Sequence, residues 1–181
     1  MIVTAILFGL AANADNLAVG TAYGVQHRRI SRLHNLLIAF ATTAVTCAAL
    51  FAGSLLHRHL LPALPNWLGG AMLILLALAG FLWPKQAPAD AAAAGVAGWR
   101  EVAVLAAALS VNNIGLAIAG GFAGLPYAVA LAAIFCFSIA LLSAGLFIGE
   151  SAGRRLASTL SQAWIGNAIL LAAGLMMLSG D

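Results

Sequence analysis

Charged side chains are the scarcest feature of this 181-residue chain. Only 7% of its residues are charged, with eight Lys and Arg against five Asp and Glu, whereas a soluble globular domain carries about 25%. Hydrophobic residues make up 64% of the chain, and the mean hydropathy is +1.05. So few charges cannot cover the surface of a water-soluble fold, and the composition therefore predicts an integral membrane protein.

Cysteine and enzyme motifs are scarce as well. The two cysteines, Cys47 and Cys136, lie in separate apolar stretches, and no Cys-x-x-Cys or Cys–His cluster exists. The sequence therefore predicts neither a disulfide framework nor a zinc site. It also lacks a P-loop, a Gly-x-Ser-x-Gly motif, a zinc-protease helix and a dinucleotide fingerprint. We expect neither an enzyme nor a bound cofactor.

The apolar residues fall into six runs of about 20 residues, the length that crosses the hydrocarbon core of a bilayer. The few charges collect in the short gaps between these runs. The pattern predicts an all-α polytopic protein whose single membrane domain, residues 1–181, leaves nothing over for a soluble domain. The six predicted spans are 2–25, 34–56, 67–83, 102–121, 127–149 and 157–178.

Basic residues occur mainly in alternate gaps. The first, third and fifth gaps carry Arg28, Arg29, Arg32, Lys85, Arg100, Arg154 and Arg155. The second gap has only Arg58, and the fourth has no positive charge. By the positive-inside rule, the odd gaps are cytoplasmic and both termini lie outside. The net charge of +3 thus reflects topology, and we expect no nucleic-acid partner.

The two halves of the chain resemble each other at a shift of 97 residues. Without a gap, the shift aligns Asn16 with Asn113, Gly24 with Gly121, Phe40 with Phe137, Trp67 with Trp164 and Gly69 with Gly166. Each half holds three spans, an odd number, so the second half inserts upside down relative to the first. The sequence predicts two inverted three-helix repeats, residues 1–83 and 99–181, joined by a cytoplasmic linker, 84–98.

Asp15 lies near the middle of the first predicted span, where no other charged side chain occurs between Met1 and Val25. A carboxylate at this depth costs at least a few kcal/mol and usually lines an ion or substrate path. Asp15 and Asn16 are echoed in span four by Asn112 and Asn113. Because inverted-repeat transporters bind substrate at the repeat interface, we expect these four side chains to converge near the membrane centre. Weaker candidates are Asn13 and Thr43.

Carboxylate, amide and hydroxyl oxygens suit a hard divalent cation. A purely structural role is the alternative, since membrane asparagines often only link helices and threonine hydroxyls can bond their own helix backbone. Adjacent residues of a regular helix diverge by about 100°. Bringing both Asp15 and Asn16 to one ion therefore requires a local distortion of the first helix.

Residues 13–24, Asn-Ala-Asp-Asn-Leu-Ala-Val-Gly-Thr-Ala-Tyr-Gly, followed by a basic turn at 27–30, resemble the start of the six-helix manganese efflux pump family. This family belongs to the lysine-exporter superfamily, and the chain is closest to the branch named for a sporulation membrane protein. Thr43-Ala-Val-Thr46 and Ser110-Val-Asn-Asn113 match the same pattern.

The resemblance implies a secondary transporter that exports Mn²⁺ across the bacterial plasma (inner) membrane, with Asp15 as the first-span aspartate. Two positions depart from the family. Asn112 stands where the fourth span carries an aspartate, and Thr42–Thr46 stands where span two tends to carry an acidic residue.

The sequence therefore predicts export of a divalent cation, with Mn²⁺ as the first choice, and proton exchange at Asp15 would offer a means of coupling. Two other functions stay open: export of small organic solutes such as amino acids, and a non-transporting membrane scaffold or assembly factor. The expected partners are membrane lipid and the transported metal ion, and a homodimer is possible.

Overall fold

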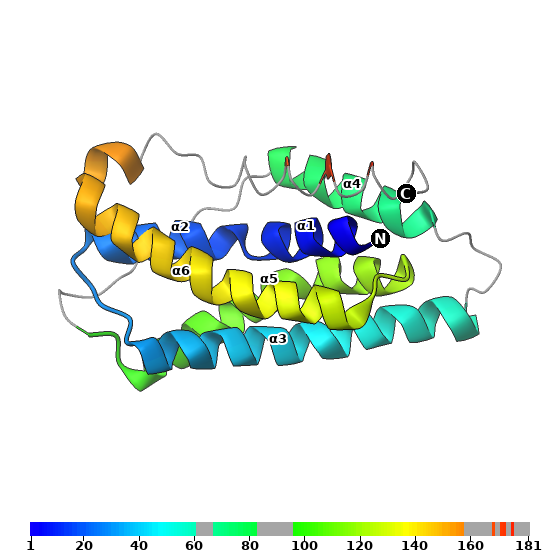
Figure 1. Cartoon of the computed structure of the whole chain (residues 1–181), viewed down its shortest axis with the longest axis horizontal. Helices are drawn as coiled ribbons and strands as arrows, with labels where there is room; N and C mark the ends of the chain where they lie inside the picture. Colours follow the sequence, from blue (N-terminus) through cyan, green and yellow to red (C-terminus); the bar gives the residue numbers. More distant parts are fainter. Residues whose placement is uncertain (61–66, 83–95, 158–167, 169–170, 173–174, 176–181) are drawn as a thin grey trace.

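The computed structural model describes residues 1–60, 67–82 and 96–157, together with the helical positions 168, 171, 172 and 175. The described residues form a bundle of helices joined by short turns (Figure 1). In chain order the elements are α1 (Ile2–Ala12), α2 (Ala14–Val25), α3 (Arg32–Leu55), a π-helical turn (Leu56–Leu60), α4 (Trp67–Leu82), α5 (Trp99–Phe122) and α6 (Tyr127–Ala157).

Among the described residues, four stretches are long and apolar enough to cross a membrane: Ile2–Val25, Arg32–His59, Trp99–Phe122 and Tyr127–Ser151. They correspond to the predicted spans 2–25, 34–56, 102–121 and 127–149. Helix α4 covers nearly all of the predicted span 67–83. The predicted span 157–178 and most of the linker 84–98 lie outside the described residues.

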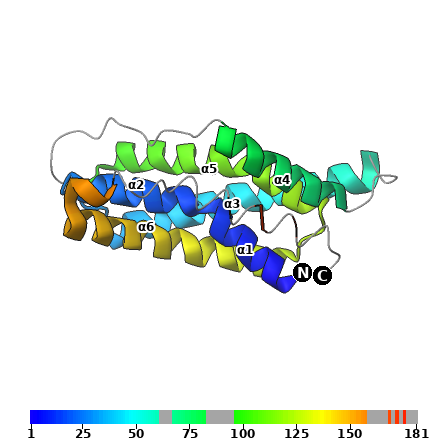
Figure 2. The ribbon, with the colours of Figure 1, turned by 90° about the horizontal axis from the view of Figure 1, so that it is seen from above.

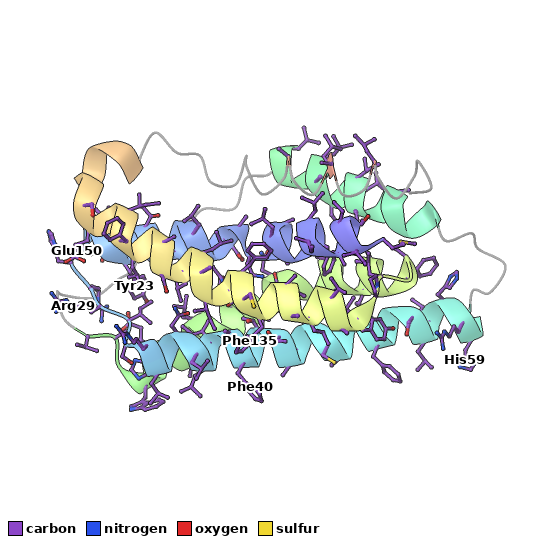
Figure 3. The ribbon with its side chains drawn as sticks, in the orientation of Figure 1. Tyr23, Arg29, Phe40, His59, Phe135 and Glu150 are labelled. Carbon is purple, nitrogen blue, oxygen red and sulfur yellow. The ribbon has the colours of Figure 1, made fainter. Side chains whose placement is uncertain are left out.

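The outer surface of the bundle is apolar, as lipid contact requires. Phe40 is 68% exposed and Phe147 72% exposed, and Figure 3 shows Phe40 pointing away from the other helices. Cys47 and Cys136 lie on the same exposed surface as free thiols. Large apolar side chains on helices of this length are typical of an integral membrane protein.

The first span is divided at Asn13, where α1 ends and α2 begins (φ −110°, ψ 9°). The backbone N–H of Asn13 donates to Leu10 at 3.3 Å. Its side-chain amide donates at 2.8 Å to the carbonyl of Gly9, the acceptor four residues back that an unbroken helix would give to that backbone N–H. The Asn13 side chain therefore replaces a helix hydrogen bond and stabilises the break.

Turn residues fix the ends of the other helices. Ser31 caps α3, since its hydroxyl accepts from the His34 backbone N–H at 3.2 Å. Gly124, in the left-handed conformation with φ 74°, ends α5. Pro126 follows it, and the Pro126 carbonyl accepts from Ala130 in the first turn of α6.

Helix α6 runs 31 residues to Ala157, beyond the predicted end of its span at 149. Its last turns bend away from the helix axis in Figure 1. These turns include Glu150, Arg154 and Arg155, and a helix leaving the apolar layer can continue because it satisfies its own backbone hydrogen bonds. Hydropathy shows only where the apolar stretch ends, and α6 continues beyond that point.

Two pairs of helices pack closely, α2 on α6 and α3 on α5 (Figure 2). Gly20 and Gly24 face Gly145 and Gly149 so closely that a Cβ on any of the four would meet backbone of the other helix. Small residues four apart allow this kind of approach in membranes.

The partners in each pair run in the same direction. Gly9 lies against Ala133 at one end of the α1–α2 span, and Gly24 lies against Leu146 at the other. On the second pair, His34 stacks edge-on against Trp99, and Gly121 lies against Leu50.

Candidate functional site

A layer of polar side chains crosses the middle of the four membrane-length helices. On either side of it lies an apolar cluster. One cluster contains Ala5, Phe8, Ala12, Leu50, Leu116, Ala117 and Ile134. The other contains Val19, Ile38, Leu105, Leu109 and Leu142. Each helix thus changes from one cluster to the other across its own polar residues: 13–16 in the first span, 42–46 in α3, 110–113 in α5 and Ser138 in α6.

Asp15 and Asn112 meet in this layer. The Asn112 amide Nδ2 donates to Asp15 Oδ2 at 2.7 Å, across a sequence separation of 97 residues. Both side chains are partly buried. This contact links the two halves of the chain at equivalent positions of the predicted repeat.

Asn13 and Asn16 instead attach the first span to α6. The Asn13 amide donates to the Ile134 carbonyl at 3.2 Å. The Asn16 amide donates to the Ser138 hydroxyl at 2.9 Å and to Asn13 Oδ1 at 3.1 Å. Both side chains are about 1% exposed. These contacts link two helices, as asparagines in membrane proteins often do. Asp15 points instead to another side of its helix, toward Asn112 of α5.

Asn113 and Thr43 bring buried oxygens to the layer from α5 and α3. Asn113 is 2% exposed, and neither its Oδ1 nor the Thr43 hydroxyl has a hydrogen-bond partner among the described residues. The His34–Trp99 and Leu50–Gly121 contacts fix the register of these two helices, and they put Asn113 at the level of Thr42–Thr46. Buried oxygens without a partner are costly and call for an explanation such as an ion.

The other threonines of α3 bond their own helix. The Thr42 hydroxyl donates to Ile38 at 2.9 Å, and the Thr46 hydroxyl donates to Thr42 at 2.7 Å. This is the structural role that hydroxyls commonly take in membrane helices. Both side chains are fully buried.

Four polar contacts were not expected from the sequence. Ser138 receives Asn16, and Ser143 receives the Asn35 amide at 2.9 Å. Near one end of the bundle, Glu101 binds both Arg28 and Tyr23. The Arg28–Glu101 contact could have been inferred from the sequence. Arg28 and Glu101 lie next to those ends of predicted spans one and four that face the same side of the membrane.

The layer is rich in neutral oxygens and poor in charge. Among residues 1–60, 67–82 and 96–157, no group of three or more His, Cys, Asp or Glu side chains is placed to hold a metal ion. One carboxylate with amide and hydroxyl oxygens can bind a hard cation weakly and release it. Such a site fits a transported ion better than a permanently bound one.

Comparison with known proteins gives no match: no protein-family model, no curated protein and no solved structure matches the chain.

Proposed function

We propose that this protein is a secondary transporter that exports a divalent metal cation, with Mn²⁺ as the first substrate to test. The observation that carries the proposal is the Asp15–Asn112 contact in a polar layer enclosed by apolar clusters on both sides. A carboxylate held inside the membrane is costly, and such residues usually mark an ion path. A polar layer closed on both sides is what an occluded transport site requires.

We infer that six spans form two inverted repeats around this layer. The 97-residue shift relates α1–α2 to α5 and α3 to α6, and it therefore exchanges the two close pairs, α2 with α6 and α5 with α3. Both pairs run parallel, as spans one and five and spans two and four must in a six-span chain. Inverted repeats of this kind bind their substrates at the repeat interface.

Binding a cation would require a change at Asn112. Its NH₂ group now faces Asp15, and an amide donor cannot ligate a metal ion. Rotation of the amide by half a turn would bring Oδ1 beside the carboxylate and create two oxygen ligands. The unpartnered oxygens of Asn113 and Thr43 would be further donors, and Asn16 and Asn13 would hold α6 in place.

Exchange of one cation for one proton at Asp15 would couple export to an ion gradient, since a carboxylate releases its proton when a cation binds. The basic residues near the start of α3 and α5 favour a cytoplasmic position for that end of the bundle. Export would then run from the basic end toward the end that carries Met1.

Cellular metal content tests this proposal. Cells expressing the protein in excess Mn²⁺ should hold less manganese than control cells, and cells expressing Asp15→Asn at equal membrane levels should match the controls. Unchanged manganese with the inserted wild-type protein would argue against the proposal. If amino-acid content fell instead, the small-solute exporter would become the better account.

A further inference from the structure

Three side chains join α2 to α5 at the end of the bundle formed by residues 26–31, the start of α5 and the C-terminal part of α6, which we call the basic-loop end. Arg28 Nη2 donates to Glu101 Oε2 at 2.7 Å. The Tyr23 hydroxyl donates to Glu101 Oε1 at 2.7 Å, and the Arg28 guanidinium lies 5.6 Å from the centre of the Tyr23 ring. The joined helices are those that carry Asp15 and Asn112.

The turn after α2 positions Arg28. His27 adopts the left-handed conformation with φ 54°, and the backbone N–H groups of His27 and Arg28 donate to Gly24 and Tyr23 at 2.9 and 3.0 Å. These two bonds form a Schellman motif, which folds the chain back over the helix end. A further bond, from Ala97 N–H to the Arg29 carbonyl at 2.9 Å, ties the turn to the segment that leads into α5.

The ion pair is largely removed from water, with Arg28 6% and Glu101 28% exposed. Burying such a pair costs hydration free energy, which the attraction between the charges only partly offsets, so the pair adds little net stability. Removing one partner is costly, because the other charge stays buried. A pair of this kind therefore favours one arrangement of the two helices strongly over the others.

Arg28 also lines a cavity together with a second acidic residue, Glu150. The cavity, of about 210 Å³, is lined by Arg28, Arg29 and Glu150, and by Gly24 and Leu146 beneath them. Figure 3 shows Glu150 from α6 at the same end of the bundle as Tyr23 and Arg29. Arg28 Nε and Nη1 have no hydrogen-bond partner in the described part of the chain. The guanidinium thus has free donors, room to move and another acceptor.

At the opposite end of the bundle, the equivalent positions among the described residues carry no charged side chain. The 97-residue shift relates Glu101 to Thr4, Tyr23 to Gly120 and Arg28 to Leu125. There Phe8 packs against Gly120, and Leu125 is buried in the same apolar cluster. The two ends of the polar layer are therefore closed by different chemistry, ionic at the basic-loop end and apolar at the other.

We propose that the Arg28–Glu101 pair is a gate that closes the basic-loop end, and that it opens when Arg28 transfers from Glu101 to Glu150. Glu101 precedes Asn112 by 11 residues, or just over three full turns, so both project from one face of α5 about 16 Å apart. The freed Glu101 carboxylate is then the first binding position for a divalent cation that moves toward Asp15. This role rests on the proposed transport function, whereas the opening itself does not need a cation.

Thiol labelling measures the opening directly. In a full-length Cys47→Ala, Cys136→Ala background, a Leu105→Cys reporter lies between the gate and the polar layer, and a Leu116→Cys reporter lies on the far side. Glu101→Gln should speed labelling of the first reporter by about tenfold or more, the ratio expected from loss of a charge-assisted hydrogen bond, and leave the second unchanged. Equal rates with and without Glu101→Gln would overturn the gate, and so would equal acceleration of both reporters.

Three further variants separate the gate from misfolding, test the second acceptor and separate the gate from transport. The exchange Arg28→Glu with Glu101→Arg should restore slow labelling, and continued fast labelling would contradict pairing as the cause. Adding Glu150→Gln to Glu101→Gln should reduce the acceleration, and no reduction would exclude Glu150 as the second acceptor. Asp15→Asn should abolish transport and keep the wild-type labelling rates, so failure of the proposed function leaves the gate result readable.

Discussion

Asn112 occupies the position at which a second carboxylate would face Asp15. With Asn112→Asp, two carboxylates would share the site, and a divalent cation would bind at least about tenfold more tightly because two nearby charges attract it. Without metal, repulsion between the carboxylates should lower the melting temperature, and added Mn²⁺ should raise it through linkage. Calorimetric titration and thermal unfolding in detergent measure both effects.

Asn13→Asp is the matched control for that experiment, because Asn13 faces α6. It adds the same charge to the same layer without facing Asp15 and should not tighten Mn²⁺ binding. Equal tightening in both variants would mean that overall charge, rather than the Asp15–Asn112 contact, determines affinity.

His27 is a non-glycine residue in the left-handed conformation that closes α2. An L-residue loses about 1 kcal/mol in that conformation, and glycine does not. His27→Gly should therefore raise the free energy of unfolding by about 1 kcal/mol. Gln26→Gly, at φ −87°, should instead lower it. A destabilised His27→Gly protein would show that the imidazole contributes more than the backbone strain costs.

At the scale of helices, close packing between α2 and α6 depends on glycine. A Cβ at Gly24 would lie 2.8 Å from the Glu150 backbone nitrogen and 2.9 Å from Gly149 Cα, and these backbone atoms cannot move aside cheaply. Gly24→Ala should cost about 2 kcal/mol through overpacking. At Gly115, no atom of another described segment lies within 4 Å of the corresponding position, so Gly115→Ala should be neutral or stabilising.

Thermal unfolding of both glycine variants in one detergent checks this difference. If Gly24→Ala and Gly115→Ala unfold at the same temperature, the contact between α2 and α6 is looser than described. The approach would then not need glycine.

Sequence reasoning located the helices better than their interruptions. Apolar length is a property of the chain alone, so α3 and α5 begin and end within about three residues of the predicted spans. The break at Asn13 is stabilised by a bond within the same span, to Gly9, and by a contact with Ile134, 121 residues away, of which the local sequence gives no signal. Gly20 and Gly24 allow either close packing or local unwinding, and the structure places them within a regular helix, where they serve packing.

Of the candidate site, the sequence could predict the contact between Asp15 and Asn112. Asp15 and Asn112 share a depth and a repeat position, and both can be read from the sequence. The orientation of a side chain around its helix depends on which helices pack where. Asn16 was expected beside Asp15, but a rotation of about 100° along the helix directs it to Ser138.

For the whole molecule, the polar layer and its apolar boundaries form one unit to which all four membrane-length helices contribute. Helix-linking asparagines such as Asn13 and Asn16 would serve a scaffold protein equally well. It does not need a carboxylate facing an amide between two apolar clusters. Ion movement through this layer is therefore the property that separates the proposed transporter from a scaffold protein.

Flux of Mn²⁺ into liposomes containing the purified protein tests that property most directly. With an outward proton gradient, wild-type vesicles should accumulate Mn²⁺ and Asp15→Asn vesicles should match protein-free ones. Asn16→Ala, which removes only a helix link, should keep measurable flux. Equal Mn²⁺ flux through wild-type and Asp15→Asn protein, reconstituted in equal amounts, would contradict the central role of Asp15.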